Sequence, residues 1–393
     1  MSADSIVIVA ARRTPIGGFQ GVLSPVSASD LGAVAIKAAV DDAGVNPDSI
    51  NDLLMGCVLP AGVGQAPARI AGLAAGLPLS VGASTLNKAC GSGMKTTMLA
   101  HDLIKAGSAR VAVSGGLESM TNAPYLLPKA RGGYRMGHQE VIDHMFYDGL
   151  QNPADGNMMG HFAENTAEKY GFTRDAQDEF AIASVTRAQQ AAEAGAFDAE
   201  IAAVTVTTRK GETVVTADEG PQTARPEKIP TLRAAFRKDG TVTAASSSSI
   251  SDGAAALVLM SAAEAEAQGI EPLARIVGHS GFAQAPEWFT TSPVFAIRAL
   301  QDKLGWTPDD VDLYEINEAF AVVTMAAMHD CGIDHAKVNV NGGACALGHP
   351  IGASGARIIV TLLHALRARS LKRGLASLCI GGGEATALAI ELI

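Results

Sequence analysis

The segment 87–95 places a cysteine, Cys90, where a turn gives way to a helix. Residues 80–86 have the pattern of a short extended run, and Gly91 and Gly93 suit a tight turn or a first helical turn packed against another backbone. Because a helix N-terminus favours an anion, we expect the thiol of Cys90 to have a pKa below about 8.5 and to act as a nucleophile. Taken alone, the pattern also fits a small buried side chain, so other segments must decide. Apolar residues follow at helical spacing, at Met94, Met98, Leu99, Leu103 and Ile104.

Three later segments supply an amide, an imidazole and a second thiol. Asn317 follows a predicted strand, His349 lies in a glycine-rich loop before a predicted helix, and Cys379 ends a predicted strand. Glu318 carries a charge at the start of a helix, where interaction with the helix dipole is an alternative to a direct catalytic role. These side chains require a fold that brings the two ends of the chain together.

Strands alternate with helices along the first part of the chain. Residues 6–11, 53–58 and 111–114 have strand character, and residues 68–75 have helical character. A further helix is predicted to start at an N-cap, Asp30, to run through Ala43 and to end at Gly44. The alternation predicts an α/β fold built in layers.

Part of this order returns late in the chain. Residues 42–50 match 303–311, and Ser92-Gly93 matches Ser354-Gly355 at a nearly constant separation. Gly116-Leu117-Glu118 likewise matches Gly382-Gly383-Glu384. Three matches in order predict a duplication, with two similar halves related by a pseudo-twofold axis. The loop of His349 would then approach the helix that follows Cys90.

The domain boundaries follow from the duplication. We expect residues 1–119 and 250–271 to form the first half, 120–249 an inserted loop domain, and 272–393 the second half. Within the insertion, a helix is predicted over 174–194 and a small hairpin around Arg209-Lys210-Gly211.

Composition excludes several classes of protein. The 393 residues are 48% hydrophobic and carry a net charge of −10 without a long basic run, which argues against nucleic acid as a partner. Five widely spaced cysteines argue against a disulfide framework, and no Cys/His cluster has zinc spacing, so no metal site is predicted. The N-terminus lacks the pattern of a signal peptide and no long apolar run suggests a membrane span, so a cytoplasmic location is expected.

Four motifs together resemble the thiolase family over essentially the whole chain. They are Cys90-Gly91-Ser92, Asn317-Glu318-Ala319-Phe320, Gly348-His349-Pro350 and Cys379-Ile380-Gly381. The resemblance implies a duplicated α/β fold with αβαβα layers and an inserted loop domain. It also implies acyl transfer between coenzyme A thioesters, either cleavage of a 3-ketoacyl-CoA or the reverse Claisen condensation.

The resemblance assigns a role to each motif. Cys90 would carry the acyl group, His349 would take its proton, and Cys379 would move the proton of the reacting carbon. The backbone N–H groups of Cys90 and Gly381 would form one oxyanion hole. His349 and a water held by Asn317 would form the other.

Coenzyme A would bind mostly to the insertion, as substrate and product rather than as a resident cofactor. Ser248 resembles a serine that bonds the pantetheine amide. Candidates for the phosphates are Arg209, Lys210, Arg225, Arg237 and Lys238. The residues expected around the acyl group are Leu150, Met159, Phe236, Phe289, Ala319 and Phe320. The family resemblance further suggests a homodimer or homotetramer, with residues 124–137 as a tetramer contact.

Within the family, the pattern favours an acetyl-CoA C-acetyltransferase that makes acetoacetyl-CoA from acetyl-CoA. The alternative is a broad-range 3-ketoacyl-CoA thiolase of fatty-acid degradation. Met158-Met159 stands where short-chain enzymes usually carry His-Met, and Glu384 follows Gly381-Gly382-Gly383 where they carry Met or Gln. These departures concern the shape of the pocket rather than the core chemistry.

Other readings are less favoured. A Rossmann dehydrogenase would need a Gly-x-Gly-x-x-Gly turn after a strand, a ketoacyl synthase normally uses two histidines, and a non-catalytic lipid carrier would be expected to lack a catalytic residue. Cys57 and Cys345 are expected to be inert. The remaining histidines of the insertion are expected in loops or at the surface: His138, His144 and His161.

Overall fold

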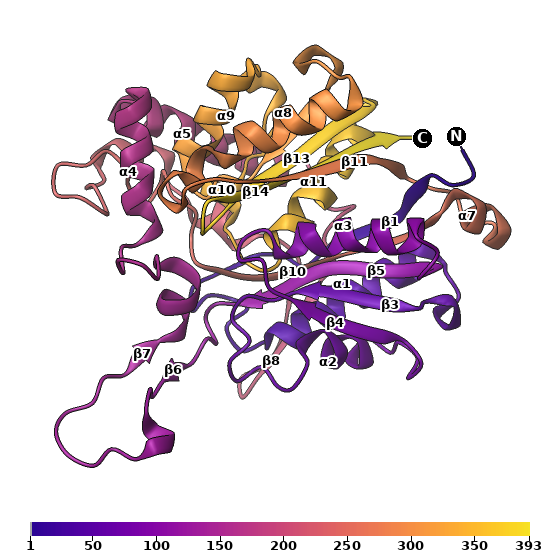
Figure 1. Ribbon diagram of the computed structural model, residues 1–393, viewed down its shortest axis with the longest axis horizontal. Helices are drawn as coiled ribbons and strands as arrows, with labels where there is room; N and C mark the ends of the chain where they lie inside the picture. The colour runs from indigo at the N-terminus through magenta and orange to yellow at the C-terminus, as the bar shows by residue number, and fades with distance from the viewer. Residues whose placement is uncertain (1) are drawn as a thin grey trace.

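The computed structural model describes residues 2–393, and a single ten-stranded sheet runs through it (Figure 1). The strand order is β12-β13-β14-β11-β1-β10-β5-β3-β4, with β2 paired to β10. The first half contributes β1 (Ile6–Arg13), β2 (Gly17–Gly18), β3 (Asp52–Gly56), β4 (Gly82–Leu86), β5 (Val111–Ser119) and β10 (Ser251–Ser261). The second half contributes β11 (Ala274–Ala283), β12 (Leu313–Ile316), β13 (Arg373–Ile380) and β14 (Glu384–Leu392).

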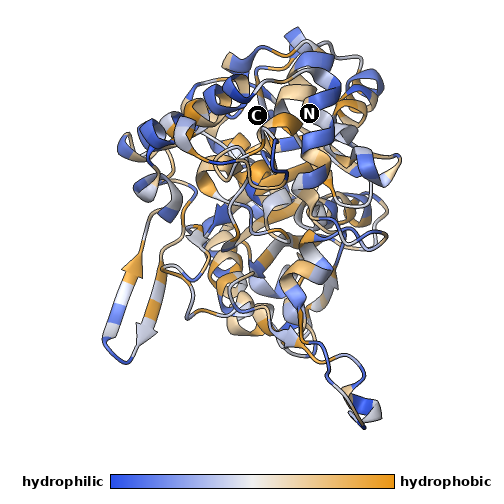
Figure 2. Cartoon of the chain, turned by 90° about the vertical axis from the view of Figure 1, so that its left-hand side faces the viewer, coloured by the Kyte–Doolittle hydropathy of each residue, from blue (hydrophilic) through white to orange (hydrophobic). Residues whose placement is uncertain are grey.

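The helices form three layers, one outside each half of the sheet and one between the halves, as Figure 1 shows. The pair α1 (Ala28–Ala43) and α2 (Pro67–Ala74) packs outside the first half, and α8 (Ser292–Leu304) with α9 (Ala321–Cys331) packs outside the second. Between the halves lie α3 (Ser92–Lys105) and α11 (Ser354–Ala368), in a core shared by both. The predicted αβαβα arrangement is therefore confirmed. Figure 2 shows apolar stretches concentrated inside the molecule and polar stretches on its outer helices.

The remaining elements belong largely to the insertion. They are β6 (Tyr125–Leu126), β7 (Ile142–Asp143), α4 (Met159–Tyr170), α5 (Arg174–Glu193), β8 (Val204–Thr208), β9 (Gly211–Val215) and α6 (Glu219–Thr223), with α7 (Ala262–Gln268) and α10 (Ala344–Leu347) outside it. Short 3₁₀ turns span Pro47–Ser49, Ala130–Gly132, Pro226–Thr231, Pro286–Thr291, Pro308–Asp310 and His335–Lys337, and a π-helical turn spans Met145–Leu150. The hairpin predicted around Arg209-Lys210-Gly211 is present and is formed by β8 and β9. In Figure 1, β6, β7 and the chain between them project from the body.

A buried ionic cluster fastens the insertion to the first half. The guanidinium of Arg13 donates to Glu200 at 2.6 Å and to Asp218 at 2.7 Å, and all three side chains are almost fully buried. Removing one partner of such a buried group leaves an uncompensated charge, so these contacts tie the insertion firmly to β1.

Two local expectations differ from the structure. The N-cap of α1 is Ser27 rather than Asp30, because the Ser27 hydroxyl accepts the N–H of Asp30 three residues later. The predicted end at Gly44 is correct, and its φ of 61° suits glycine. β5 also continues well beyond Ser114, to Ser119.

Among residues 2–393, no helix is long and apolar enough to cross a membrane.

The contact between α3 and α11 is made by backbone at their N-terminal ends. A Cβ on Gly93 would lie 2.8 Å from the nitrogen of Ala356, and a Cβ on Gly355 would overlap the nitrogen of Met94. Gly93 and Gly355 are the residues that the sequence repeat pairs. Each helix follows a loop with a predicted catalytic side chain, Cys90 before α3 and His349 before α11. The absence of side chains at this crossing therefore sets the distance between the two loops.

Gly355→Ala should lower the free energy of unfolding by about 1–3 kcal/mol, because the backbone must move apart to admit a methyl group. Urea denaturation measures this loss. Gly132→Ala is the control, because its Cβ would meet open space. Equal stability of the two variants would show that the crossing tolerates a side chain.

Candidate active site

A cavity of about 550 Å³ lies between the ends of the central helices and the insertion. Ten of the residues predicted for the site line it: Cys90, His349, Gly381, Ser248, Leu150, Met159, Phe236, Phe289, Ala319 and Phe320. Cys379 and Asn317 lie behind this lining and are almost completely buried. The structure thus gathers residues from both halves and the insertion around one space.

Cys90 lies in the turn between β4 and α3, just before the helical residues begin. Ala89 adopts a φ of 43°, and the Ser92 hydroxyl accepts the N–H of Lys88, so the turn is closed by its own residues. Burial raises the pKa of the Cys90 thiol to about 11, although the backbone N–H groups of Gly381 and Cys90 act in the opposite direction. The prediction of a lowered pKa is therefore wrong, because desolvation outweighs the helix terminus.

An ion pair joins the two loops that would form the first oxyanion hole. Lys88, two residues before Cys90, donates to Glu384, three residues after Gly381. Glu384 is one of the positions where the sequence departs from the short-chain pattern. Its contact holds the Gly381 loop against the Cys90 loop.

His349 presents an unprotonated nitrogen to the cavity. Its Nδ1 lies 2.5 Å from the hydroxyl of Ser354, and that hydroxyl donates to the carbonyl of Pro350 at 2.9 Å. The hydroxyl can only accept from the ring, so the proton of the neutral imidazole is on Nδ1. Burial and the charge of Arg357 lower the pKa of His349 to about 3, and Nε2 has no partner among residues 2–393. Nε2 is thus available as a proton acceptor.

Cys379 and Asn317 complete the polar groups beneath the cavity floor. Burial and the nearby Cys90 raise the pKa of Cys379 well above its usual value, so it is a thiol at neutral pH. The Asn317 carbonyl oxygen accepts from Arg357 at 3.4 Å, while its Nδ2 has no partner in the described chain. That free donor is suited to hold a water molecule.

Sequence reasoning missed the part played by Glu118. Its carboxylate accepts the backbone N–H groups of Val58, Leu59 and Gly352, at 2.8–3.1 Å, and thus joins the loop after β3 to the loop before α11. Burial raises the pKa of Glu118 to about 7. The repeat marks this position, but only the fold shows which amides surround it.

The cavity walls include four phenylalanines and three methionines. Phe289 packs edge-to-face on Phe162 at 6.4 Å between ring centroids, and Phe236 packs likewise on Phe320 at 5.9 Å. The Ser248 hydroxyl donates to the carbonyl of Ala319 at 3.1 Å. Its lone pairs therefore remain free to accept an amide N–H from a ligand.

Several residues considered from the sequence lie elsewhere. His144 is buried, not at the surface, and both ring nitrogens have partners: Nδ1 bonds Asp148 at 2.5 Å and Nε2 accepts the N–H of Ala61. Glu318 is also buried and accepts from Ser184, Asn339 and the N–H of Cys345.

The candidates for the phosphates differ in their positions. The hairpin of Arg209 and Lys210 packs its valines, Val204 and Val206, into the core under α1, away from the cavity. Arg225 bonds neighbouring carbonyls. Arg237 bonds His161 and Asn165, whereas Lys238 is exposed and lies two residues from the cavity-lining Phe236.

Two family descriptions match consecutive parts of the chain. Residues 6–263 match the thiolase N-terminal domain, and residues 270–392 match the thiolase C-terminal domain. The chain belongs to the thiolase family. As a thiolase, it is similar to proteins named acetyl-CoA acetyltransferase from several organisms.

The relative from Cupriavidus necator is 50% identical over 388 residues, which cover 98% of this chain and 99% of the relative. The relative from Escherichia coli K12 is 50% identical over 387 residues, 98% of each chain. The crystal structure of the Bacillus anthracis acetyl-CoA acetyltransferase superposes with a TM-score of 0.97 at 43% identity and covers 99% of each chain. The similarity thus extends over both halves and the insertion.

Proposed function

We propose that this thiolase is an acetyl-CoA C-acetyltransferase, which reversibly joins two molecules of acetyl-CoA to give acetoacetyl-CoA and coenzyme A. The full-length relatives named acetyl-CoA acetyltransferase favour this reaction over the broad-range degradative alternative. The observation that carries the proposal is the free Nε2 of His349 on the same cavity as the Cys90 sulfur.

The first half-reaction acetylates Cys90. Its sulfur attacks the thioester carbonyl while Nε2 of His349 takes the thiol proton, and the N–H groups of Cys90 and Gly381 stabilise the oxyanion. Coenzyme A leaves and takes a proton from Cys379, which burial keeps as a thiol until that moment. The products are acetyl-Cys90, protonated His349 and the Cys379 thiolate.

The second half-reaction forms the carbon–carbon bond. The Cys379 thiolate takes a proton from the methyl carbon of a second acetyl-CoA, and the enolate oxygen accepts from Nε2–H of His349 and from a water on Asn317. The enolate carbon attacks the acetyl group, and the sulfur of Cys90 leaves with the proton of His349. Every protein group returns to its starting state.

The carrier part of the substrate lies along the insertion in this proposal. Ser248 accepts a pantetheine amide, and Lys238 is the best placed of the predicted cations for the phosphates. Residues 120–249 then act as the binding domain, and coenzyme A is substrate and product rather than a resident cofactor.

We also propose a cytoplasmic homo-oligomer, a dimer or a tetramer. The projecting β6–β7 arm exposes Leu127, Met136 and Val141, with Met136 92% exposed. Apolar side chains on an arm that stands away from the body suit a contact between copies of the chain.

Cys379→Ser should slow condensation by about 10²–10⁴-fold while affecting acetylation of Cys90 much less, because the leaving coenzyme A can also take a proton from water. Peptide mass spectrometry after incubation with acetyl-CoA measures the acetyl group, and acetoacetyl-CoA formation measures condensation. Cys345→Ser is the control, since Cys345 does not line the cavity. An acetyl group on a residue other than Cys90, or equal loss of both half-reactions, would contradict the assigned roles.

Phe289→Ala should reduce the preference for acetoacetyl-CoA over longer 3-ketoacyl-CoA substrates. The unaltered enzyme should lose kcat/KM with each added methylene, because a closed apolar wall discriminates by about 1–3 kcal/mol per methylene. Phe295→Ala is a matched control, because Phe295 lies on α8 and does not line the cavity. Comparable kcat/KM for four-carbon and ten-carbon substrates in the unaltered enzyme would favour the broad-range alternative.

A further inference from the structure

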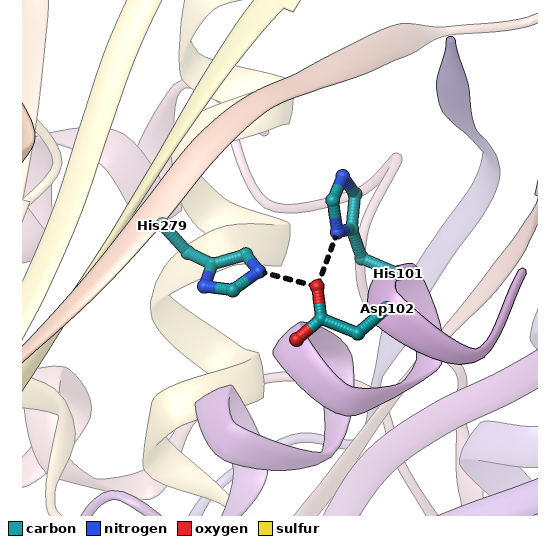
Figure 3. A group of neighbouring side chains, drawn as sticks. All are labelled: His101, Asp102 and His279. Carbon is teal, nitrogen blue, oxygen red and sulfur yellow. Dashed lines mark hydrogen bonds and ion pairs between the residues drawn. The ribbon is translucent and has the colours of Figure 1, made fainter. Parts of the chain in front are cut away.

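The two halves of the sheet meet at a short seam. β1 and β11 pair only through Val7↔Arg275 and Ile8↔Ala274, after which β11 continues along β14. Beyond the seam, side chains rather than strand pairing must connect β11 to the first half. Besides apolar packing in the central core, one polar contact does so, between His101 and Asp102 of α3 and His279 of β11 (Figure 3).

A bulge in β11 directs His279 toward α3. The register with β14 shifts between Ile276 and Gly278, which leaves Val277 as the extra residue. Ile276 faces the central core, whereas Val277 and Gly278 both lie toward α8. His279 therefore returns to the central face, on which strict alternation would not have placed it.

The three side chains converge on one oxygen atom. Nδ1 of His101 and Nε2 of His279 each lie 2.9 Å from Oδ1 of Asp102. The rings meet edge to face at 5.1 Å between centroids. The side chains of the histidines are 18% and 15% exposed and that of Asp102 is 51% exposed, so the group opens to solvent on one side.

We propose that His101, Asp102 and His279 form a binding site for a divalent transition-metal ion of the zinc class, bridging the two halves of the thiolase fold. Nothing in the acyl-transfer mechanism uses these residues. The ion would be structural, and a water molecule would fill its remaining position.

The geometry of the cluster fits this chemistry. In a tetrahedral site with metal–ligand distances of about 2.0–2.2 Å, neighbouring ligand atoms lie roughly 3.3–3.6 Å apart. The three ligand atoms lie within 4.8 Å of one another, and both pairs that include Asp102 are at 2.9 Å. A small rotation of the imidazoles would bring the three ligand atoms to the spacing that a bound ion requires. Two imidazoles and one carboxylate favour zinc, cobalt or nickel over magnesium or calcium.

Metal binding balances without a co-reactant. Each neutral imidazole moves its single proton from the coordinating nitrogen to the opposite one, which is Nε2 in His101 and Nδ1 in His279. The carboxylate of Asp102 binds as the anion. The spacing rules applied to the sequence missed this set, because 177 positions separate Asp102 from His279.

Binding is tested on the full-length protein after treatment with EDTA and dialysis. Titration with ZnCl₂ in a calorimeter should show one ion per chain, and the thermal midpoint should rise with zinc concentration. CoCl₂ should give a visible absorption spectrum without the thiolate charge-transfer band that binding at a cysteine would produce.

His279→Gln separates metal binding from simple packing, because glutamine can still donate to Asp102 but is a poor metal ligand. The zinc affinity of this variant should fall by about 10–100-fold or more, since even loss of an outer-sphere partner lowers metal affinity that much. Acetyl transfer should be unchanged, because His279 does not line the cavity. The control is His329→Gln: His329 bonds the adjacent Asp330 at 2.8 Å in the same way but has no third ligand among the described residues.

Retention of zinc affinity by His329→Gln and its loss in His279→Gln would support the site. Equal zinc affinity of His279→Gln and the unaltered chain would overturn it. A thiolate band in the cobalt spectrum, or no binding at all by the unaltered chain, would also overturn it.

Discussion

The backbone contact between α3 and α11 is the constraint on which the site depends. Gly93 and Gly355 let the helices meet without side chains, and the loops that precede them carry Cys90 and His349. Neither half contains the whole of the proposed site, because the Cys90 sulfur comes from one half and the His349 imidazole from the other. The duplication therefore has a chemical consequence: it builds one site from two equivalent helix ends.

Burial at this contact disfavours the charged forms of Cys90 and His349. Desolvation disfavours both a thiolate at Cys90 and an imidazolium at His349, so both groups are neutral before substrate binds. In the proposed mechanism, proton transfer therefore accompanies attack on the thioester, and the N–H groups of Cys90 and Gly381 stabilise the oxyanion. Glu118 and the Lys88–Glu384 pair hold the surrounding loops and so preserve this arrangement.

The sequence was informative where the signal is local or repeated. The repeat and the four motifs predicted the layered fold and the convergence of the two loops. The sequence also predicted correctly that α1 ends at Gly44, which has a positive φ. Features that depend on distant neighbours were missed. The pKa of Cys90 depends on how much protein covers it, His144 is buried by loop packing, and the His101–Asp102–His279 cluster depends on a bulge that no local pattern reveals.

The most direct measurement is the pH dependence of the rate at which iodoacetamide alkylates Cys90 in the free enzyme. The rate measured with the Cys90→Ser variant is subtracted at each pH to correct for the other thiols. For a neutral thiol beside a neutral imidazole, the rate should rise about tenfold per pH unit and reach no plateau below about pH 9. A plateau already present near pH 7 would reveal a preformed thiolate–imidazolium pair, and would contradict a site in which burial keeps both Cys90 and His349 uncharged until the substrate arrives.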